Sequence, residues 1–139
     1  MDVRGLTPIL NVSDIEASLV WFERLGWHRR PLPTGERDGE PARFAAVAST
    51  ETEIFLCQGA QGSRGQRDPR FPGDDTTDGF WMSWWLETPE DVDAAYARAV
   101  ELALEVSWPP TDEPWGVREF QLRHPDGHTF RISSGLREA

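Results

Sequence analysis

The sequence predicts an α+β fold in which two βαβββ modules form a curved mixed sheet. The first observation is an internal repeat, because Asp14-Ile15-Glu16-Ala17 recurs as Asp91-Val92-Asp93-Ala94, and each copy follows an apolar run and begins a helical pattern. The second is that strand-like runs fill the rest of each half, so that strand, helix and three strands occur twice. We expect one domain over 1–139, with modules at 1–57 and 80–139 and a connecting loop at 58–79, rich in Gly, Pro, Asp and Arg.

Each predicted helix has a start signal and one apolar face. For the first helix we expect Ser13 as the N-cap, with Glu16 completing a capping box. Thr88 is the expected N-cap of the second helix, with Asp91 three residues later. The apolar face of the first helix comprises Ile15, Leu19, Phe22 and Leu25. That of the second comprises Val92, Ala95, Tyr96, Ala99 and Val100. Each helix should therefore pack one face on a sheet.

The strands are predicted from apolar or alternating runs that are bounded by turn-forming residues. In the first module they cover residues 6–12, 27–32, 42–49 and 52–57. In the second module they cover residues 80–87, 105–108, 118–123 and 128–133. The last two form a hairpin, because the sequence His124-Pro125-Asp126-Gly127 between them is a strong turn signal.

Composition excludes several functional classes. The net charge of −10 and the pI of about 4.7 argue against a nucleic-acid partner and favour either a cationic ligand or solubility alone. All 14 basic residues are arginines, which excludes Schiff-base chemistry and a lysine base. Cys57 is the single cysteine and should be a buried apolar residue. With no signal peptide and no membrane-spanning run, we expect a cytoplasmic protein without a membrane partner.

Tryptophans provide the positive evidence for a binding site. There are seven in 139 residues, and Trp81, Trp84 and Trp85 share one predicted strand. Alternation sends Trp84 to one face and the other two to the opposite face, so one group belongs to the core and the other should line the concave face. Trp115 lies in a loop between Pro114 and Gly116, which favours a ligand-stacking role.

The remaining aromatic residues divide between core and surface. Trp108 could form the wall of a groove or anchor the end of a strand, and Trp21 should lie on the surface or at a dimer contact. Trp27 should close the end of the first helix. Strand-core positions are expected for Phe44, Phe120 and Phe130.

The segment Pro-Trp-Gly-Val-Arg-Glu-Phe at 114–120, leading into the hairpin, resembles the bleomycin resistance proteins of the vicinal oxygen chelate superfamily, which also holds glyoxalase I and the extradiol dioxygenases. The resemblance spans nearly the whole chain, because paired βαβββ modules are the glyoxalase-like fold of that superfamily. It implies a homodimer with two grooves at the interface, each binding an antibiotic without modifying it. Matching positions are Trp115, Gly116 and the strand from Trp81 to Trp85, and Arg64, Arg67 and Arg70 of the long connecting loop could reshape the groove.

Enzymes of this superfamily hold a divalent metal with His, Gln or Glu ligands. The resemblance places those positions at Thr7, Phe55, Arg131 and Ser83, the last with a one-residue uncertainty that admits Met82 or Trp84. These residues are not metal ligands, and a guanidinium would repel a cation. We therefore expect no metal and no other cofactor.

No substitute catalytic group stands out elsewhere in the sequence. His124 and His128 flank the hairpin turn and should be solvated, while His28 is followed by Arg29 and Arg30, which disfavours cation binding. Glu53, on the same strand face as Phe55, is a weaker candidate for a carboxylate ligand. The sequence offers no Ser-His-Asp or Cys-His set.

The function we predict is therefore metal-free antibiotic sequestration by a homodimer. A planar or cationic compound, such as a bleomycin or an enediyne, would suit the aromatic groove. Besides the positions named for the motif and its strand, the expected ligand-binding residues are Ser83, Phe55, Trp108 and Arg131. Two alternatives remain: an enzyme, either glyoxalase-like or dioxygenase-like with a displaced metal site or a metal-free isomerase, and a binding module for an ordinary metabolite.

Overall fold

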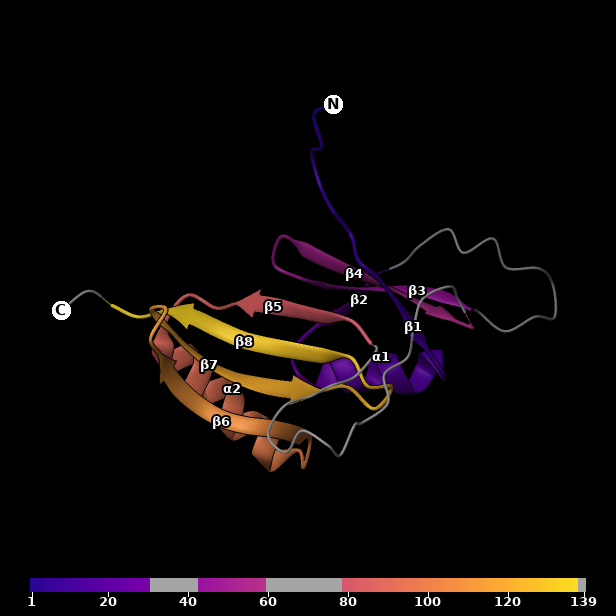
Figure 1. Cartoon of the computed structure of the whole chain (residues 1–139). Helices are drawn as coiled ribbons and strands as arrows, with labels where there is room; N and C mark the ends of the chain where they lie inside the picture. Colours follow the sequence, from indigo (N-terminus) through magenta and orange to yellow (C-terminus); the bar gives the residue numbers. More distant parts are fainter. Residues whose placement is uncertain (31–42, 60–78, 138–139) are drawn as a thin grey trace. The chain divides into compact units, whose positions relative to one another are not determined.

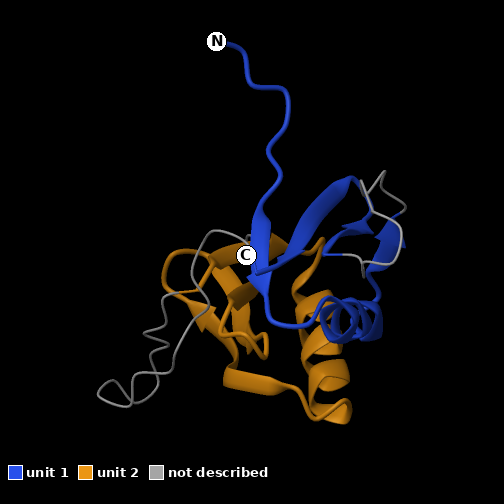
Figure 2. Ribbon diagram, turned by 90° about the vertical axis from the view of Figure 1, so that its right-hand side faces the viewer, with its two compact units in different colours: residues 1–62 blue, residues 63–139 orange. Residues whose placement is uncertain are grey.

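The computed structural model describes residues 1–30, 43–59 and 79–137. Its contacts divide the chain into two compact units, residues 1–62 and 63–139 (Figure 2). Most of the predicted connecting loop, with Arg64, Arg67 and Arg70, lies outside the described residues. Neither of the helices in the described part is long and apolar enough to cross a membrane.

The first unit contains a four-stranded mixed sheet with one helix against it. Its elements, in chain order, are β1 (Ile9–Val12), α1 (Ile15–Arg24), β2 (His28–Arg30), β3 (Phe44–Ser49) and β4 (Thr52–Gln58). The strand order is β1-β4-β3-β2, in which β1 and β4 are parallel and the other neighbours antiparallel. Helix α1 packs on β2, β3 and β4, and Phe22 together with Val47 and Leu56 is fully buried. This is the expected packing of an amphipathic helix on a sheet.

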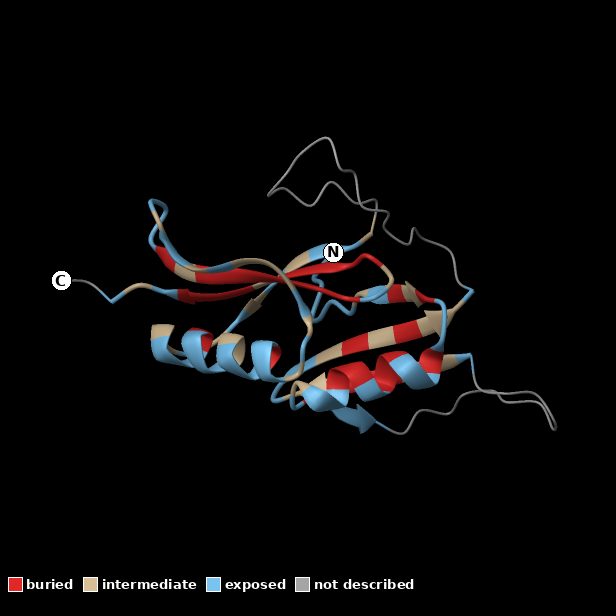
Figure 3. Cartoon of the chain, turned by 90° about the horizontal axis from the view of Figure 1, so that it is seen from below, coloured by how far each residue is buried: buried red, intermediate tan, exposed pale blue. Residues whose placement is uncertain are grey.

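The second unit repeats this topology (Figure 1). Its elements are β5 (Trp81–Trp85), α2 (Pro89–Glu101), β6 (Glu105–Glu113), β7 (Val117–Arg123) and β8 (Thr129–Gly135). The strand order is β5-β8-β7-β6, again with one parallel pair, β5 and β8. Helix α2 packs on β6, β7 and β8, and the buried residues concentrate in the central strands β7 and β8 (Figure 3). The predicted α+β fold of two βαβββ modules is confirmed.

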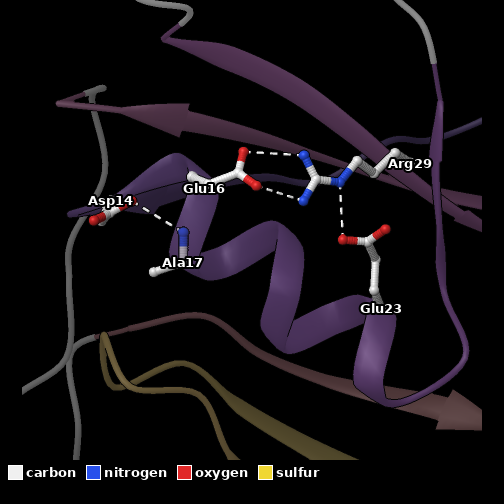
Figure 4. A network of polar contacts seen from close by, with 5 residues as sticks. All are labelled: Asp14, Glu16, Ala17, Glu23 and Arg29. Carbon is white, nitrogen blue, oxygen red and sulfur yellow. Dashed lines mark hydrogen bonds and ion pairs between the residues drawn. The ribbon is translucent and has the colours of Figure 1, made fainter.

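Helix α1 begins one residue later than the sequence indicated. Asp14, not Ser13, is the N-cap, and its carboxylate accepts a hydrogen bond from the backbone N–H of Ala17 at 3.0 Å. Glu16 makes no capping box. It forms a bidentate ion pair with Arg29 of β2, with N–O distances of 2.6 and 3.0 Å, while the Nε of Arg29 donates to Glu23 at 2.8 Å (Figure 4). These two carboxylates raise the pKa of Arg29 above its ordinary value, chiefly through the hydrogen bonds, and the network fastens β2 to the helix.

The N-cap of helix α2 is Thr88, as predicted, with a complete capping box to Asp91. The two N-caps, at 14 and 88, are therefore 88 − 14 = 74 residues apart, whereas the matching tetrapeptides are 91 − 14 = 77 apart. Asp14 is the N-cap of α1, whereas Asp91 is the third residue of α2. The two modules therefore repeat the same topology, but the matching tetrapeptides are displaced by three residues relative to the starts of the helices.

Strand β6 is longer than predicted. It runs from Glu105 to Glu113, through Pro109 and Pro110, instead of ending at Trp108. Proline removes a backbone donor, but β6 lies at the edge of its sheet, where that donor need not be paired. Two register shifts, on either side of Trp108, accommodate the extra residues.

Several burial predictions are wrong. Trp21 is buried on α1, where its ring packs edge-on against Phe22 with centroids 5.1 Å apart, so it is a core residue. Val100 of α2 is exposed because it lies at the margin of the apolar face centred on Val92 and Ala99. The two residues predicted as buried on strands of the first unit, Phe44 and Cys57, are only half-buried. Trp27 is buried against Phe22 after α1 ends, as predicted.

Candidate ligand-binding site

The second sheet has two unlike faces. One packs against α2 and is apolar, because Phe120 and Ile132 are buried there and Phe120 meets Tyr96 of the helix edge-on at 5.5 Å. Trp84 belongs to this face and stacks on Phe130 with ring centroids 4.3 Å apart. Trp81 and Trp85 are each 66% exposed, as expected for residues on the opposite side of the same strand. The predicted division of these tryptophans is confirmed.

The opposite face carries a layer of buried polar side chains. Alternation along β7 and β8 places on this face the buried residues Glu119, Gln121, Arg123, Thr129 and Ser133. A face that served only as hydrophobic core would not hold two arginines, a glutamate and a glutamine within four strands. Convergent polar groups beside exposed aromatic rings are typical of ligand-binding surfaces.

Three tryptophans gather around one guanidinium on this polar face. The Cζ atom of Arg131 lies 5.5 Å from the ring centroid of Trp81 and 5.7 Å from those of Trp108 and Trp115. All three distances are within the range of cation–π attraction. Trp81 and Trp115 remain 66% and 61% exposed. We call these four residues the tryptophan–arginine cluster.

The strand register explains how the cluster forms. Ser83, Arg131, Gln121 and Trp108 are successive partners across β5, β8, β7 and β6, so they form one row on the sheet. Trp81 lies two residues before Ser83 and therefore on the same face. Trp115 comes from the turn between β6 and β7 and reaches the same guanidinium.

Gly116 fixes the turn that presents Trp115. Its φ of +87° is in the left-handed region that favours glycine. The N–H of Gly116 donates to the carbonyl of Glu113 at 3.0 Å, and its carbonyl accepts from the N–H of Leu136 at 2.9 Å. The turn is thus tied to the residue after β8, which holds the ring near Arg131.

Arg131 is held in place by a carboxylate. An Nη of Arg131 forms a short ion pair with Glu119, whose second oxygen accepts from the hydroxyl of Ser133 at 2.8 Å. The Glu119 side chain is 4% exposed and that of Arg131 is 22% exposed. In such a buried pair, the attraction between the charges is largely offset by the cost of removing both from water, so the pair is weak evidence for stability. Its clear effect is to orient the guanidinium among the rings.

The cluster contains four of the eight predicted ligand-binding residues. Gly116 supports it, and Ser83 is exposed beside Arg131 in the strand register. Trp85 is on the same face but has no ring contact with Arg131 among the described residues. Phe55 belongs to the first unit, where its ring meets that of Phe44 at 5.2 Å. Whether these residues bind a ligand stays a prediction.

Sequence reasoning missed Glu119 and Ser133. Glu119 was visible as an acidic residue next to Phe120 in a predicted core strand, and Gln121 and Arg123 continue the same alternation. That pattern marks a strand with one polar face. The partner of Arg131 could not be named, because it depends on how β7 and β8 align.

The residues that the resemblance places at metal-ligand positions do not fit a metal. Thr7 is exposed and precedes β1, and the β1 residue that pairs with Phe55 is Ile9. Ser83 offers one hydroxyl beside the guanidinium of Arg131, whose positive charge opposes a cation. Glu53 is engaged by Arg30 in a short ion pair. Among the described residues, no group of three or more His, Cys, Asp or Glu could hold a metal ion.

The hairpin histidines are not solvated, contrary to the prediction. His124 is 1% exposed and His128 is fully buried, with their ring centroids 5.5 Å apart. The Nδ1 of His124 accepts the N–H of Asp126 at 3.0 Å, and that of His128 accepts the N–H of Phe80 at 2.9 Å. Burial, with a contribution from the neighbouring His128, lowers the pKa of His124 to about 4. These rings support the turn and the start of β5. His28, in contrast, is exposed.

Comparisons with solved structures agree with the fold. TioX from Micromonospora sp. ML1 is 18% identical, with a TM-score of 0.71 over 96% of this chain and 100% of that chain. Lactoylglutathione lyase from Agrobacterium tumefaciens is 15% identical, with a TM-score of 0.67 over 96% and 95%. A bleomycin-binding protein complexed with bleomycin is 17% identical, with a TM-score of 0.62 over 98% and 100%. At these identities the likeness concerns the fold alone.

The sequence comparisons give the family. No curated protein matches the chain. The family model described as Glyoxalase/Bleomycin resistance protein/Dioxygenase superfamily matches residues 6–132, which include every strand and both helices of the described residues except the last residues of β8. The chain therefore belongs to the glyoxalase/bleomycin resistance protein/dioxygenase superfamily.

Proposed function

We propose that this chain is a homodimeric binding protein of the bleomycin resistance type, which sequesters a planar aromatic antibiotic without modifying it. The tryptophan–arginine cluster is the observation that carries the proposal. Exposed large rings on a sheet face are the usual sign of a binding surface, and each ring stacked on a flat ligand contributes about 0.5–1.5 kcal/mol beyond area burial. Trp81, Trp108 and Trp115 would form the stacking walls, with Gly116 positioning the third.

Two further observations support binding over catalysis. The positions that bind metal in the superfamily's enzymes hold Thr7, Phe55, Ser83 and Arg131, which lack the donor chemistry for it. A fold neighbour is a bleomycin-binding protein complexed with bleomycin. Elemental analysis of untagged protein distinguishes the two functions, because about one Ni, Zn, Fe or Mn per chain would overturn the proposal in favour of an enzyme.

Replacing Trp115 by alanine should weaken ligand binding by one to a few kcal/mol, a magnitude typical of interface aromatic residues. The ligands to titrate are bleomycin-type and enediyne-type compounds, with tryptophan fluorescence quenching as the measurement. A thermal-shift screen can find the best of them first, since a ligand at 100 times its dissociation constant stabilises by about 2.7 kcal/mol.

The matched control is Trp85→Ala, which removes an equally large exposed ring of the same sheet face that lies outside the tryptophan–arginine cluster. We expect it to weaken binding less than Trp115→Ala. If the Trp115→Ala protein bound as tightly as the parent, the turn would have to be assigned to architecture alone.

We also expect the protein to form a two-fold homodimer. The exposed rings of Trp81, Trp85 and Trp115 make an apolar area that a second copy or a ligand would cover. Light scattering at micromolar concentration should give twice the chain mass of 15.8 kDa. A mass of one chain would contradict the dimer and leave ligand binding to be tested on the monomer.

A further inference from the structure

The charge of the tryptophan–arginine cluster constrains what can bind to it. The three rings already face a cation of the protein itself, because Arg131 lies 5.5–5.7 Å from each centroid. A ligand cation stacked on the same rings would add a second positive charge beside the guanidinium. The net charge of −10 attracts cations over the whole surface, but it does not change this local arrangement.

The carboxylate of Glu119, which holds Arg131, cannot compensate for a ligand cation. One oxygen of Glu119 accepts from Arg131 and the other accepts from Ser133. Because the Glu119 side chain is only 4% exposed, a ligand ammonium could reach these oxygens only by displacing one of the buried donors. That exchange leaves a charged group without its partner in a buried place, which is costly.

The guanidinium, in contrast, has unused donors. Arginine carries five N–H groups, and Glu119 is the hydrogen-bond acceptor that the described residues provide for Arg131. Its Nε is buried and finds no acceptor among them. A buried donor without a partner is costly, and the side chain is still 22% exposed. An acceptor brought by a ligand could pair with the N–H groups that the contact with Glu119 leaves unused.

We propose that Arg131 selects ligands whose conjugated ring carries an acceptor oxygen, as a carbonyl, phenolate or carboxylate, and disfavours planar cations. The inference rests on the proposed function and deepens it. The ring would stack on the tryptophans while the oxygen takes the unused N–H groups of the planar guanidinium, an arrangement suited to arginine and not to lysine. Ligand choice at this site is therefore set by Arg131, while the rings supply stacking affinity.

The test compares two three-ring probes, anthraquinone-2-carboxylate and the cation 9-aminoacridine. Binding is measured by tryptophan quenching and calorimetry on the parent and on the double variant Arg131→Gln, Glu119→Gln. The double variant keeps the net charge of the chain and leaves no buried carboxylate unpaired. We expect the parent to bind the carboxylate at least about tenfold more tightly than 9-aminoacridine, and the double variant to lose that preference.

A second variant guards against loss of folding. Arg131→Lys keeps the charge and the ion pair but not the planar fork, so carboxylate binding should fall while 9-aminoacridine binding stays unchanged. If 9-aminoacridine bound the parent more tightly, or if neither variant changed the preference, this inference would be overturned and the proposed function would stand. If neither probe, bleomycin nor any enediyne quenched the tryptophans, both would fall together.

Discussion

Replacing Phe120 by alanine is expected to lower the free energy of unfolding by about 3–5 kcal/mol. Phe120 of β7 is 1% exposed, and its ring packs edge-on against Tyr96 of α2. Truncating it opens a cavity between the sheet and its helix that neighbouring side chains can fill only in part. Urea denaturation followed by far-ultraviolet circular dichroism measures the loss without relying on tryptophan fluorescence.

The control is Trp115→Ala, which removes a larger ring from an exposed turn. It should cost little stability, since the lost contact with Arg131 is a single exposed cation–π interaction of about 0.5–1 kcal/mol. If both variants were equally unstable, Trp115 would be part of the core packing. Equal and small losses would instead mean that Phe120 is not a core residue.

Acidification should destabilise the protein through His124. Its pKa in the folded state is about 4, lowered chiefly by burial, against an ordinary value of 6.5. As the pH falls, the unfolded chain therefore binds the proton first. The stability that depends on a neutral His124 is fully present above pH 6.5 and is lost as the pH falls towards 4. The full difference between the two pKa values corresponds to about 3 kcal/mol of unfolding free energy, of which about 2 kcal/mol is lost by pH 5.

The measurement is the free energy of unfolding at pH 7 and pH 5 for the parent and for His124→Asn. Asparagine can accept the N–H of Asp126 as Nδ1 does, but it does not titrate. The variant should lose less stability on acidification than the parent, by about 2 kcal/mol. His28→Asn, at an exposed position, is the control and should retain the parent's pH dependence. Identical pH profiles for parent and His124→Asn would refute the role of His124.

The order of elements was predictable because it is encoded locally. Thr88 and Asp91 specify the start of α2 through a capping box, and Pro125-Asp126-Gly127 specifies the hairpin turn. The alternation of Trp81, Trp84 and Trp85 needs only the period of a strand. Such signals involve residues within a few positions of each other.

Predictions failed where the outcome depended on neighbours distant in sequence. Burial of His124 and His128 depends on the residue before β5, since the backbone N–H of Phe80 donates to the His128 ring. The sequence indicated Ser13 as the N-cap, but Asp14 has that role, and Glu16 binds Arg29 instead of completing a capping box. The Arg131–Glu119 pair requires the β7–β8 register, so sequence could name Arg131 as a site residue without its partner.

The two prolines of β6 also limit how the protein can associate. Pro109 and Pro110 lie on an edge strand of the second sheet and remove two consecutive backbone donors. A strand from another chain would find an interrupted hydrogen-bonding ladder there, further disturbed by the register shifts around Trp108. This edge is therefore protected against strand addition and the aggregation that follows from it. Self-association through this sheet is left to its other edge, β5, or to its tryptophan-bearing face.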